Sequence, residues 1–170
     1  MKIDKEIISK IEREYFFISG ILDVDAKYFK KRIDEGVQHS TYNYKTNVKG
    51  MRTDWEFFNK DKNFRTLLLQ IIDYLEQSNF AFKACELDHS WGLIEKFGDY
   101  TKKHDHAPAY FSGNLYLNDH HQKLYFPEIK QEITPKKGRF VIFSSFLVHH
   151  TKRNLRDTAK YAIAFNFVTQ

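Results

Sequence analysis

The chain has 170 residues, a formal net charge of +5 and one cysteine, Cys85. This length suits one domain with a substantial core, and we expect that domain to span residues 1–170. The lone cysteine excludes an internal disulfide and a cysteine-rich zinc site. Charged residues make up 29% of the chain, with only 7 glycines and 3 prolines, which excludes a disordered or low-complexity protein.

The N-terminal residues are charged throughout and lack the apolar core of a signal peptide. No apolar run approaches the roughly 18 residues that a membrane span needs. We therefore expect a cytoplasmic protein with no membrane partner. Lysines and arginines are scattered rather than clustered, which favours a solvated basic surface; an anionic substrate or a nucleic acid partner is the alternative.

The first half of the chain predicts helices and one strand. A short helix is expected around residues 7–11 and a strand over residues 15–18. Asp25 is a candidate N-cap for a helix that Gly36 would end. Residues 37–60 have no clean period and are expected to form a loop with one short element near a binding site, whose candidate contact residues are Tyr42, Tyr44, Arg52 and Trp55.

A second helix is predicted after Asp61, because apolar residues recur there at helical spacing. From residue 80 onward the pattern changes to short aromatic and β-branched segments, at residues 80–82, 90–94, 111–117, 123–126, 140–146 and 161–168. Helices followed by many short strands predict an α+β fold, with the strands in a sandwich or jelly roll.

Two histidines, His104 and His106, precede the aromatic strand predicted at residues 111–117. In an extended segment both point to one face and Asp105 points to the other, so the pair could begin a metal site. Two further histidines, His149 and His150, follow a later apolar strand and could supply a third ligand. Histidines at strand ends are more often solvated or bonded to the backbone.

Lys160 opens the last predicted strand. A lysine at the mouth of an apolar strand is costly unless its ammonium group meets an anion or extends into solvent. The sequence therefore allows either a solvated lysine or an anchor for an acidic cosubstrate.

Four segments in this order resemble the prolyl-hydroxylase-like branch of the Fe(II)- and 2-oxoglutarate-dependent oxygenases, which includes small members encoded by bacteriophages. They are residues 98–106, which are similar to the family's His-x-Asp segment, residues 115–118, residues 133–143 with their Pro-Lys-x-Gly turn, and residues 160–163. The resemblance implies a double-stranded β-helix, or jelly roll, supported by N-terminal helices. It also implies the host cytoplasm as the location if the chain is phage-encoded.

The resemblance assigns roles to individual residues. His104 and His149 correspond to metal ligands, and Lys160 would bind the distal carboxylate of 2-oxoglutarate together with the Tyr116 hydroxyl group. Asn114 would line the cosubstrate pocket. His150 would be exposed or would support the site indirectly, and Trp91, Tyr110 and Asn166 are either pocket walls or core residues.

His106 departs from the family pattern, because it stands where the family has a carboxylate ligand. His106 could bind the metal, swing away and leave a coordination site open, or be replaced by Asp105 through a local bulge. We favour a ligand set of His104, His106 and His149, since imidazole binds Fe(II) well. Three neutral imidazoles leave the metal its full charge of +2, which makes zinc or no metal an alternative.

The resemblance thus implies a 2-oxoglutarate-dependent dioxygenase that hydroxylates an unidentified substrate, a prolyl residue by analogy. It would use Fe(II), 2-oxoglutarate as cosubstrate and ascorbate as a further candidate factor. The prime substrate would be a protein or a small molecule, with nucleic acid as another option. Two alternatives remain: a three-histidine cupin-type metal dioxygenase that does not use 2-oxoglutarate, and a non-catalytic jelly-roll binding module.

Overall fold

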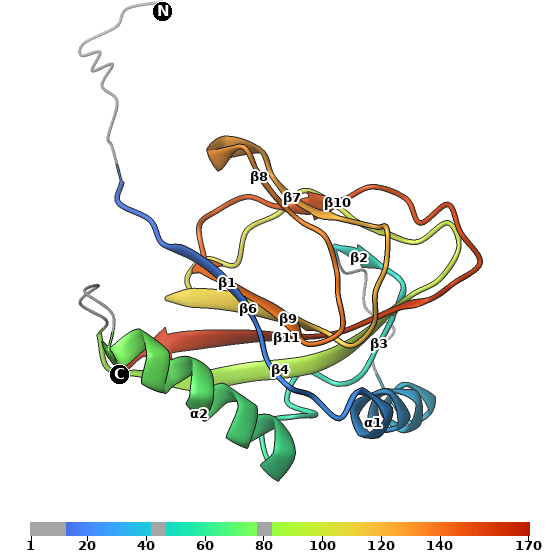
Figure 1. Cartoon of the computed structure of the whole chain (residues 1–170), viewed down its shortest axis with the longest axis horizontal. Coiled ribbons are helices and arrows are strands. Elements are labelled where there is room, and N and C mark those ends of the chain that lie inside the picture. The colour runs from blue at the N-terminus through green and yellow to red at the C-terminus, as the bar shows by residue number, and fades with distance from the viewer. Residues whose placement is uncertain (1–12, 42–46, 78–82) are drawn as a thin grey trace, which may run out of the picture.

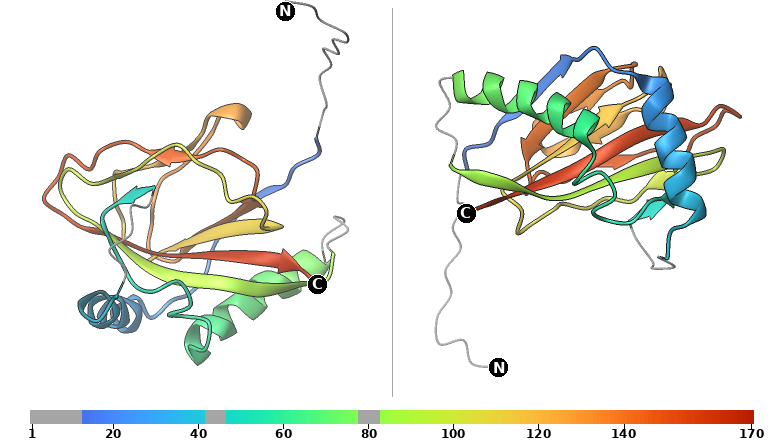
Figure 2. Two further views of the ribbon diagram at one scale, coloured as in Figure 1. Left: turned by 180° about the vertical axis from the view of Figure 1, so that it is seen from behind. Right: turned by 90° about the horizontal axis from the view of Figure 1, so that it is seen from below.

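The computed structural model describes residues 13–41, 47–77 and 83–170. Its centre is an antiparallel six-stranded sheet made of β1 (Phe17–Ile21), β3 (Met51–Arg52), β4 (Cys85–Glu95), β6 (Phe111–Tyr116), β9 (Arg139–Ser144) and β11 (Lys160–Thr169). The strand order is β1-β9-β6-β11-β4-β3. Helices α1 (Ala26–Gln38) and α2 (Lys62–Gln77) cover one face of this sheet, as Figures 1 and 2 show.

The other face of the large sheet is covered by a smaller, three-stranded sheet (Figure 1). It consists of β7 (Leu124–Phe126), β8 (Gln131–Ile133) and β10 (His150–Thr151), with the short 3₁₀ turn η1 (Pro127–Ile129) between β7 and β8. A two-stranded ribbon of β2 (Val48–Lys49) and β5 (Tyr100–Thr101) lies beside this sheet, where β5 contacts β10. The molecule therefore has three layers: helices, a large sheet and a small sheet.

The predicted α+β class is confirmed, and both described helices begin where the sequence predicts. The Asp25 side chain accepts a hydrogen bond from the Tyr28 backbone N–H at 3.0 Å, and Asp61 accepts one from the Phe64 N–H at 3.0 Å. Each carboxylate satisfies an N–H group that the first helical turn leaves unpaired.

The prediction that Gly36 ends the first helix is wrong, because α1 continues to Gln38. Gly36 is buried inside the helix, and a Cβ atom added to it would lie 2.7 Å from Thr53 Cγ2 and 2.6 Å from the Phe57 ring. Glycine is therefore present to let the helix approach residues 53–57 closely, not to end it.

The described residues form three hydrophobic clusters: one between the helices and the large sheet, one between the two sheets, and a small third one of Trp91, Leu93 and Ala164 beside the second. The first contains Phe29, Ile33, Phe64, Leu68 and Ile71 from the helices and Leu115, Ile142, Ile163 and Phe165 from the strands. The second contains Tyr116, Leu124, Phe126, Ile133, Val141, Phe143, Leu147 and Ala162. Neighbouring residues Leu115 and Tyr116 thus serve opposite faces, as the pleat of a strand requires.

The strand predictions are partly confirmed. The five described segments expected from residue 90 onward correspond to β4, β6, β7, β9 and β11, whereas the strand expected at residues 15–18 lies at Phe17–Ile21. The two-residue strands β2, β3, β5 and β10, and the three-residue β8, were not predicted, because such short segments have no measurable period. The elements predicted at residues 7–11 and 80–82 lie outside the described residues. Neither described helix is long and apolar enough to cross a membrane.

Replacement of Gly36 by alanine tests the packing of α1. Alanine favours a helix by about 1 kcal/mol over glycine, but its Cβ would collide with Thr53. Thr53 is fully buried and its hydroxyl oxygen accepts a hydrogen bond from the Gly92 N–H at 2.9 Å, so it cannot move away easily. We expect Gly36→Ala to lower the free energy of unfolding by about 1–3 kcal/mol, as overpacking does. Urea denaturation measures this change, and a gain in stability would contradict it.

Candidate functional site

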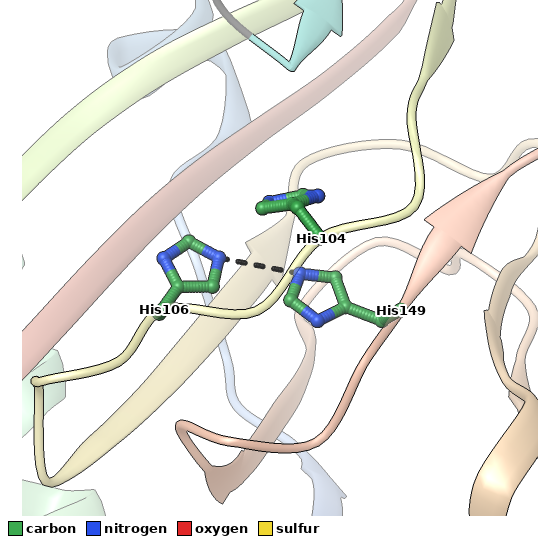
Figure 3. Close-up of side chains that lie close together, drawn as sticks. All are labelled: His104, His106 and His149. Carbon is green, nitrogen blue, oxygen red and sulfur yellow. Dashed lines mark hydrogen bonds between the residues drawn. The ribbon is translucent and has the colours of Figure 1, made fainter. Parts of the chain in front are cut away.

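Three histidine side chains converge between the two sheets (Figure 3). One ring nitrogen from each of His104, His106 and His149 lies within 4.8 Å of the others. The His106 and His149 rings are parallel, at an angle of 2°, with their Nε2 atoms 3.2 Å apart. This cluster is the one group of three or more potential metal ligands found in residues 13–41, 47–77 and 83–170.

Backbone pairing places these three side chains. His104 and His149 form an isolated antiparallel bridge: the His104 N–H donates to the His149 carbonyl group at 3.1 Å, and the His149 N–H donates to the His104 carbonyl group at 2.9 Å. The His106 N–H donates to the Ser145 carbonyl group at 2.9 Å. The segment after β5 is thus fixed against the segment after β9, although neither histidine segment is a full strand.

Hydrogen bonds to backbone carbonyl groups show which ring nitrogen of His104 and of His149 carries the proton and which one has a lone pair. His104 Nδ1 lies 2.7 Å from the Lys102 carbonyl oxygen, and His149 Nδ1 lies 2.9 Å from the Leu147 carbonyl oxygen. A carbonyl oxygen only accepts, so each Nδ1 carries the proton and each Nε2 presents a lone pair. Metal-binding histidines are commonly oriented in this way.

The three imidazoles are uncharged at neutral pH. Burial, together with the nearby His104, lowers the pKa of His106 to about 3. Burial also lowers the pKa of His104, and it lowers that of His149 well below its ordinary value, with additional contributions from the other two rings. Neutral imidazole is the form that binds a metal ion.

The structure distinguishes between the arrangements considered for His106. The His106 side chain points toward His149, whereas Asp105 is exposed and its Oδ1 accepts a hydrogen bond from the Ala107 N–H at 3.1 Å. No bulge brings Asp105 inward. His150 stacks on Tyr125, with ring centroids 5.4 Å apart, and lies outside the cluster, as expected.

A small cavity of about 40 Å³ lies beside the histidines, between the sheets. The residues proposed for a cosubstrate, Asn114, Tyr116 and Lys160, line this same cavity together with the histidines. Its remaining wall residues are mostly apolar and include Val48, Trp91, Leu93, Leu124, Ala162 and Ala164. The fold thus brings these candidate residues, which come from four separate segments, to one cavity.

Lys160 is neither solvated nor free to act as a simple anchor, because it pairs with a buried carboxylate. Its Nζ forms an ion pair with Glu95 Oε2, and the two residues are 3% and 1% exposed. They are direct neighbours across β11 and β4. Sequence reasoning missed Glu95, although period-2 alternation from Trp91 would have placed it on the same face.

Two threonines missed by the sequence hold the Glu95 carboxylate. Thr101 Oγ1 and Thr151 Oγ1 lie 3.2 Å and 3.4 Å from Glu95 Oε1. The Thr151 hydroxyl oxygen also accepts from the Thr101 N–H at 2.8 Å and from Gln122 Nε2 at 3.3 Å. Since its oxygen already accepts twice, the hydroxyl proton of Thr151 is available for Glu95.

Of the other residues considered as pocket walls, one lines the cavity and two do not. Trp91 lines the cavity, whereas Tyr110 packs in the helix-side core and Asn166 accepts a hydrogen bond from Ser112 at 2.7 Å. Trp55 packs edge-on against Trp91 and does not itself line the cavity. The Arg52 guanidinium group covers the Trp55 ring at 3.8 Å. Tyr42 and Tyr44 lie outside the described residues.

No family model and no curated protein matches this sequence, but solved structures match its fold. The viral collagen prolyl hydroxylase vCPH from Paramecium Bursaria Chlorella virus-1, solved with 2-oxoglutarate, has a TM-score of 0.70 and 15% identity over 93% of this chain and 97% of its own. A Pseudomonas putida prolyl-4-hydroxylase has a TM-score of 0.66 and 14% identity over 91% and 92%. HygX from Streptomyces hygroscopicus, solved with nickel and 2-oxoglutarate, has a TM-score of 0.64 and 11% identity over 92% and 83%. The chain therefore has the double-stranded β-helix fold of 2-oxoglutarate-dependent oxygenases, as predicted.

The residues present fit a divalent metal ion. The cluster supplies neutral imidazoles, and the two Nδ1–H groups of His104 and His149 are held by carbonyl oxygens so that Nε2 faces the shared space. Imidazole nitrogen suits iron, zinc, copper and nickel. At the other end of the cavity the residues fit 2-oxoglutarate less well. Lys160 would have to bind the distal carboxylate of 2-oxoglutarate, but its ammonium group already pairs with the carboxylate of Glu95.

The low histidine pKa values predict a stability that depends on pH. Between about pH 6.5 and 3 the unfolded chain protonates His106, but the folded metal-free protein does not. The unfolded state then binds more protons, so the free energy of unfolding is unaffected above pH 6.5 and falls below it, by about 1.4 kcal/mol per pH unit for this histidine. His106→Gln should reduce this slope. Urea denaturation with EDTA between pH 7.5 and 4.5 measures it; parallel profiles for the two proteins would contradict the prediction.

Proposed function

We propose that this protein is an Fe(II)-dependent oxygenase that uses a 2-oxo acid as cosubstrate, with 2-oxoglutarate as the first candidate, to hydroxylate a second substrate. The observation that carries the proposal is that three converging imidazoles and a buried lysine line one cavity. The fold supports it, since vCPH and HygX were solved with 2-oxoglutarate in the same architecture. We further propose that residues 1–170 act as one domain and that it works in the cytoplasm.

In this proposal His104, His106 and His149 hold the metal ion. Reciprocal backbone hydrogen bonds fix the distance between His104 and His149, so little reorganisation is needed when the ion binds. The carbonyl groups of Lys102 and Leu147 keep the Nδ1 protons in place and direct the Nε2 lone pairs inward. His106 takes the position at which the oxygenase family that this sequence resembles has a carboxylate ligand.

Bound Fe(II) and a 2-oxo acid would supply the oxidising chemistry: one O2, the oxo acid and a C–H bond would yield CO2, the acid shortened by one carbon and the hydroxylated product. The protein's own contribution is binding and water exclusion. Asn114 and Tyr116 present polar groups from one face of β6, and Trp91, Leu93 and Ala164 form an apolar wall beside the histidines. An apolar wall limits water, which would otherwise compete for reactive groups.

The substrate class rests on analogy. Two of the similar structures are described as prolyl hydroxylases, and HygX has also been solved with hygromycin B. A prolyl residue of a protein is therefore the first candidate, and a small molecule is the second. Ascorbate is a candidate reductant for the metal in assays.

A three-histidine oxygenase that uses no oxo acid is the second candidate function. It is favoured by His106, which completes an all-imidazole cluster, and by the pairing of Lys160 with Glu95, which occupies the lysine with a partner of the protein's own. In this case the Lys160–Glu95 ion pair would only stabilise the fold and would not bind a cosubstrate.

Metal binding tests the histidine cluster. His149→Ala should lower the affinity for Zn(II) or Co(II) by more than about a hundredfold, because loss of a direct ligand exceeds the 10–100-fold effect of losing an outer partner. Asp105→Ala and His150→Ala are matched controls, since both residues neighbour ligands but point elsewhere. Isothermal titration calorimetry measures the affinities. Equal affinity of His149→Ala and the wild type would refute the assignment.

The two candidate functions differ in their need for Lys160. We expect the double variant Lys160→Met/Glu95→Gln, which removes both buried charges together, to bind metal normally but to lose at least about tenfold in affinity for 2-oxo acids. Oxo-acid decarboxylation in the presence of Fe(II), ascorbate and O2 should fall in parallel. If the wild type neither binds nor decarboxylates any oxo acid yet consumes O2 with another substrate, the second candidate is correct.

A further inference from the structure

The end of the cavity remote from the histidines contains a carboxylate that belongs to the protein. We infer that Glu95 determines the class of cosubstrate, and that the cavity prefers a 2-oxo acid with an uncharged far end over the dianion 2-oxoglutarate. This inference rests on the proposed function and specifies it further.

The Glu95–Lys160 pair leaves no net charge at this end of the cavity. Both side chains line it and both are almost completely buried. A carboxylate of a bound ligand that approached Lys160 would also approach Glu95. Repulsion between two carboxylates a few ångströms apart in a protein interior is much larger than in water.

Glu95 is held where it is and does not easily make room. Its Oε2 pairs with Lys160, and its Oε1 accepts from the hydroxyl groups of Thr101 and Thr151. Its backbone is fixed as well, because β4 pairs with β11 at Glu95 and Lys160 and Asn154 Nδ2 donates to the Glu95 carbonyl oxygen at 3.3 Å. Displacement of this carboxylate would leave two threonine hydroxyl groups and an ammonium group without their acceptor.

An uncharged oxygen atom meets no such repulsion. The Lys160 ammonium group has three N–H donors, and within the described residues it forms a single ion pair, with Glu95. Tyr116 lies in the same cavity, and burial together with the charge of Glu95 raises the pKa of its hydroxyl group far above the ordinary value, so the group stays a donor. Lysine and tyrosine donors can therefore bind a carbonyl, ester or hydroxyl oxygen.

Other charged groups near this end do not restore a net positive charge. Arg139 lies close enough to lower the pKa of Tyr116, but its guanidinium group donates to the Thr134 carbonyl oxygen at 2.9 Å and does not line the cavity. His120 Nε2 donates to the Thr158 carbonyl oxygen at 3.0 Å, and the lowered pKa of His120 favours its neutral form. Neither offers a second cation to a ligand carboxylate.

The first arm of the test needs no mutation. Calorimetry on the zinc-loaded full chain would compare 2-oxoglutarate with its 5-methyl ester, which has the same chelating end and an uncharged far end. We expect the wild type to bind the ester at least about tenfold more tightly. Tighter binding of 2-oxoglutarate would overturn the inference.

The second arm uses Glu95→Gln, which keeps the size of the side chain and removes its charge. We expect its affinity for 2-oxoglutarate to rise at least about tenfold and its affinity for the ester to change less than about threefold. Glu132→Gln is the matched control, because Glu132 pairs with Lys123 on the exposed surface. If Glu95→Gln does not fold, the wild-type comparison decides alone. Failure of both ligands to bind would refute the proposed function itself, whereas tight binding of 2-oxoglutarate to both proteins would refute only the role of Glu95.

Discussion

The pairing of β11 between β4 and β6 is the constraint on which the site depends. In this register Lys160 stands beside Glu95, and Ala162 stands beside Tyr116. Because side chains alternate across a strand, one face of these three strands packs against the helices and the other lines the cavity. A shift of one residue in β11 would turn Lys160 toward the helices and remove it from the cavity. Stability and function thus depend on the same hydrogen-bond ladder.

The histidine cluster depends on a weaker kind of pairing. His104, His106 and His149 lie in the segments after β5 and β9, which are joined by an isolated bridge rather than a ladder. Three backbone hydrogen bonds nevertheless orient the segments, and two carbonyl groups select the ring nitrogens that face inward. The energetic cost of gathering three buried polar rings is reduced because each stays uncharged.

The distribution of charge separates this cavity from the pattern that its sequence resembles. That pattern has one carboxylate at the metal and, at the far end, a basic residue that binds the distal carboxylate of 2-oxoglutarate. Here the ligand position is occupied by the neutral His106, and a carboxylate, Glu95, instead accompanies Lys160. The total charge of the protein groups is the same in both cases. The arrangement of these charges differs: with a metal ion bound, positive charge would concentrate at the histidines, and the end of the cavity with Glu95 and Lys160 would carry no net charge.

Local period and spacing predicted the helix-then-strand order, the N-cap at Asp25 and a helix after Asp61. They also marked His104 and His106 as candidate ligands, whereas the choice of His149 over His150 came from the resemblance to an oxygenase family that the sequence shows. The sequence also identified Lys160, but not the partner of its ammonium group. Only the tertiary structure could show that Gly36 lies inside a helix against Thr53, that Asp105 faces away from the cluster, and that Glu95 neutralises Lys160. Each of these depends on which segments become neighbours across a sheet or between layers. That information is non-local, because hydrogen-bond register and burial are properties of the assembled fold, whereas a sequence pattern records only the face on which a side chain lies.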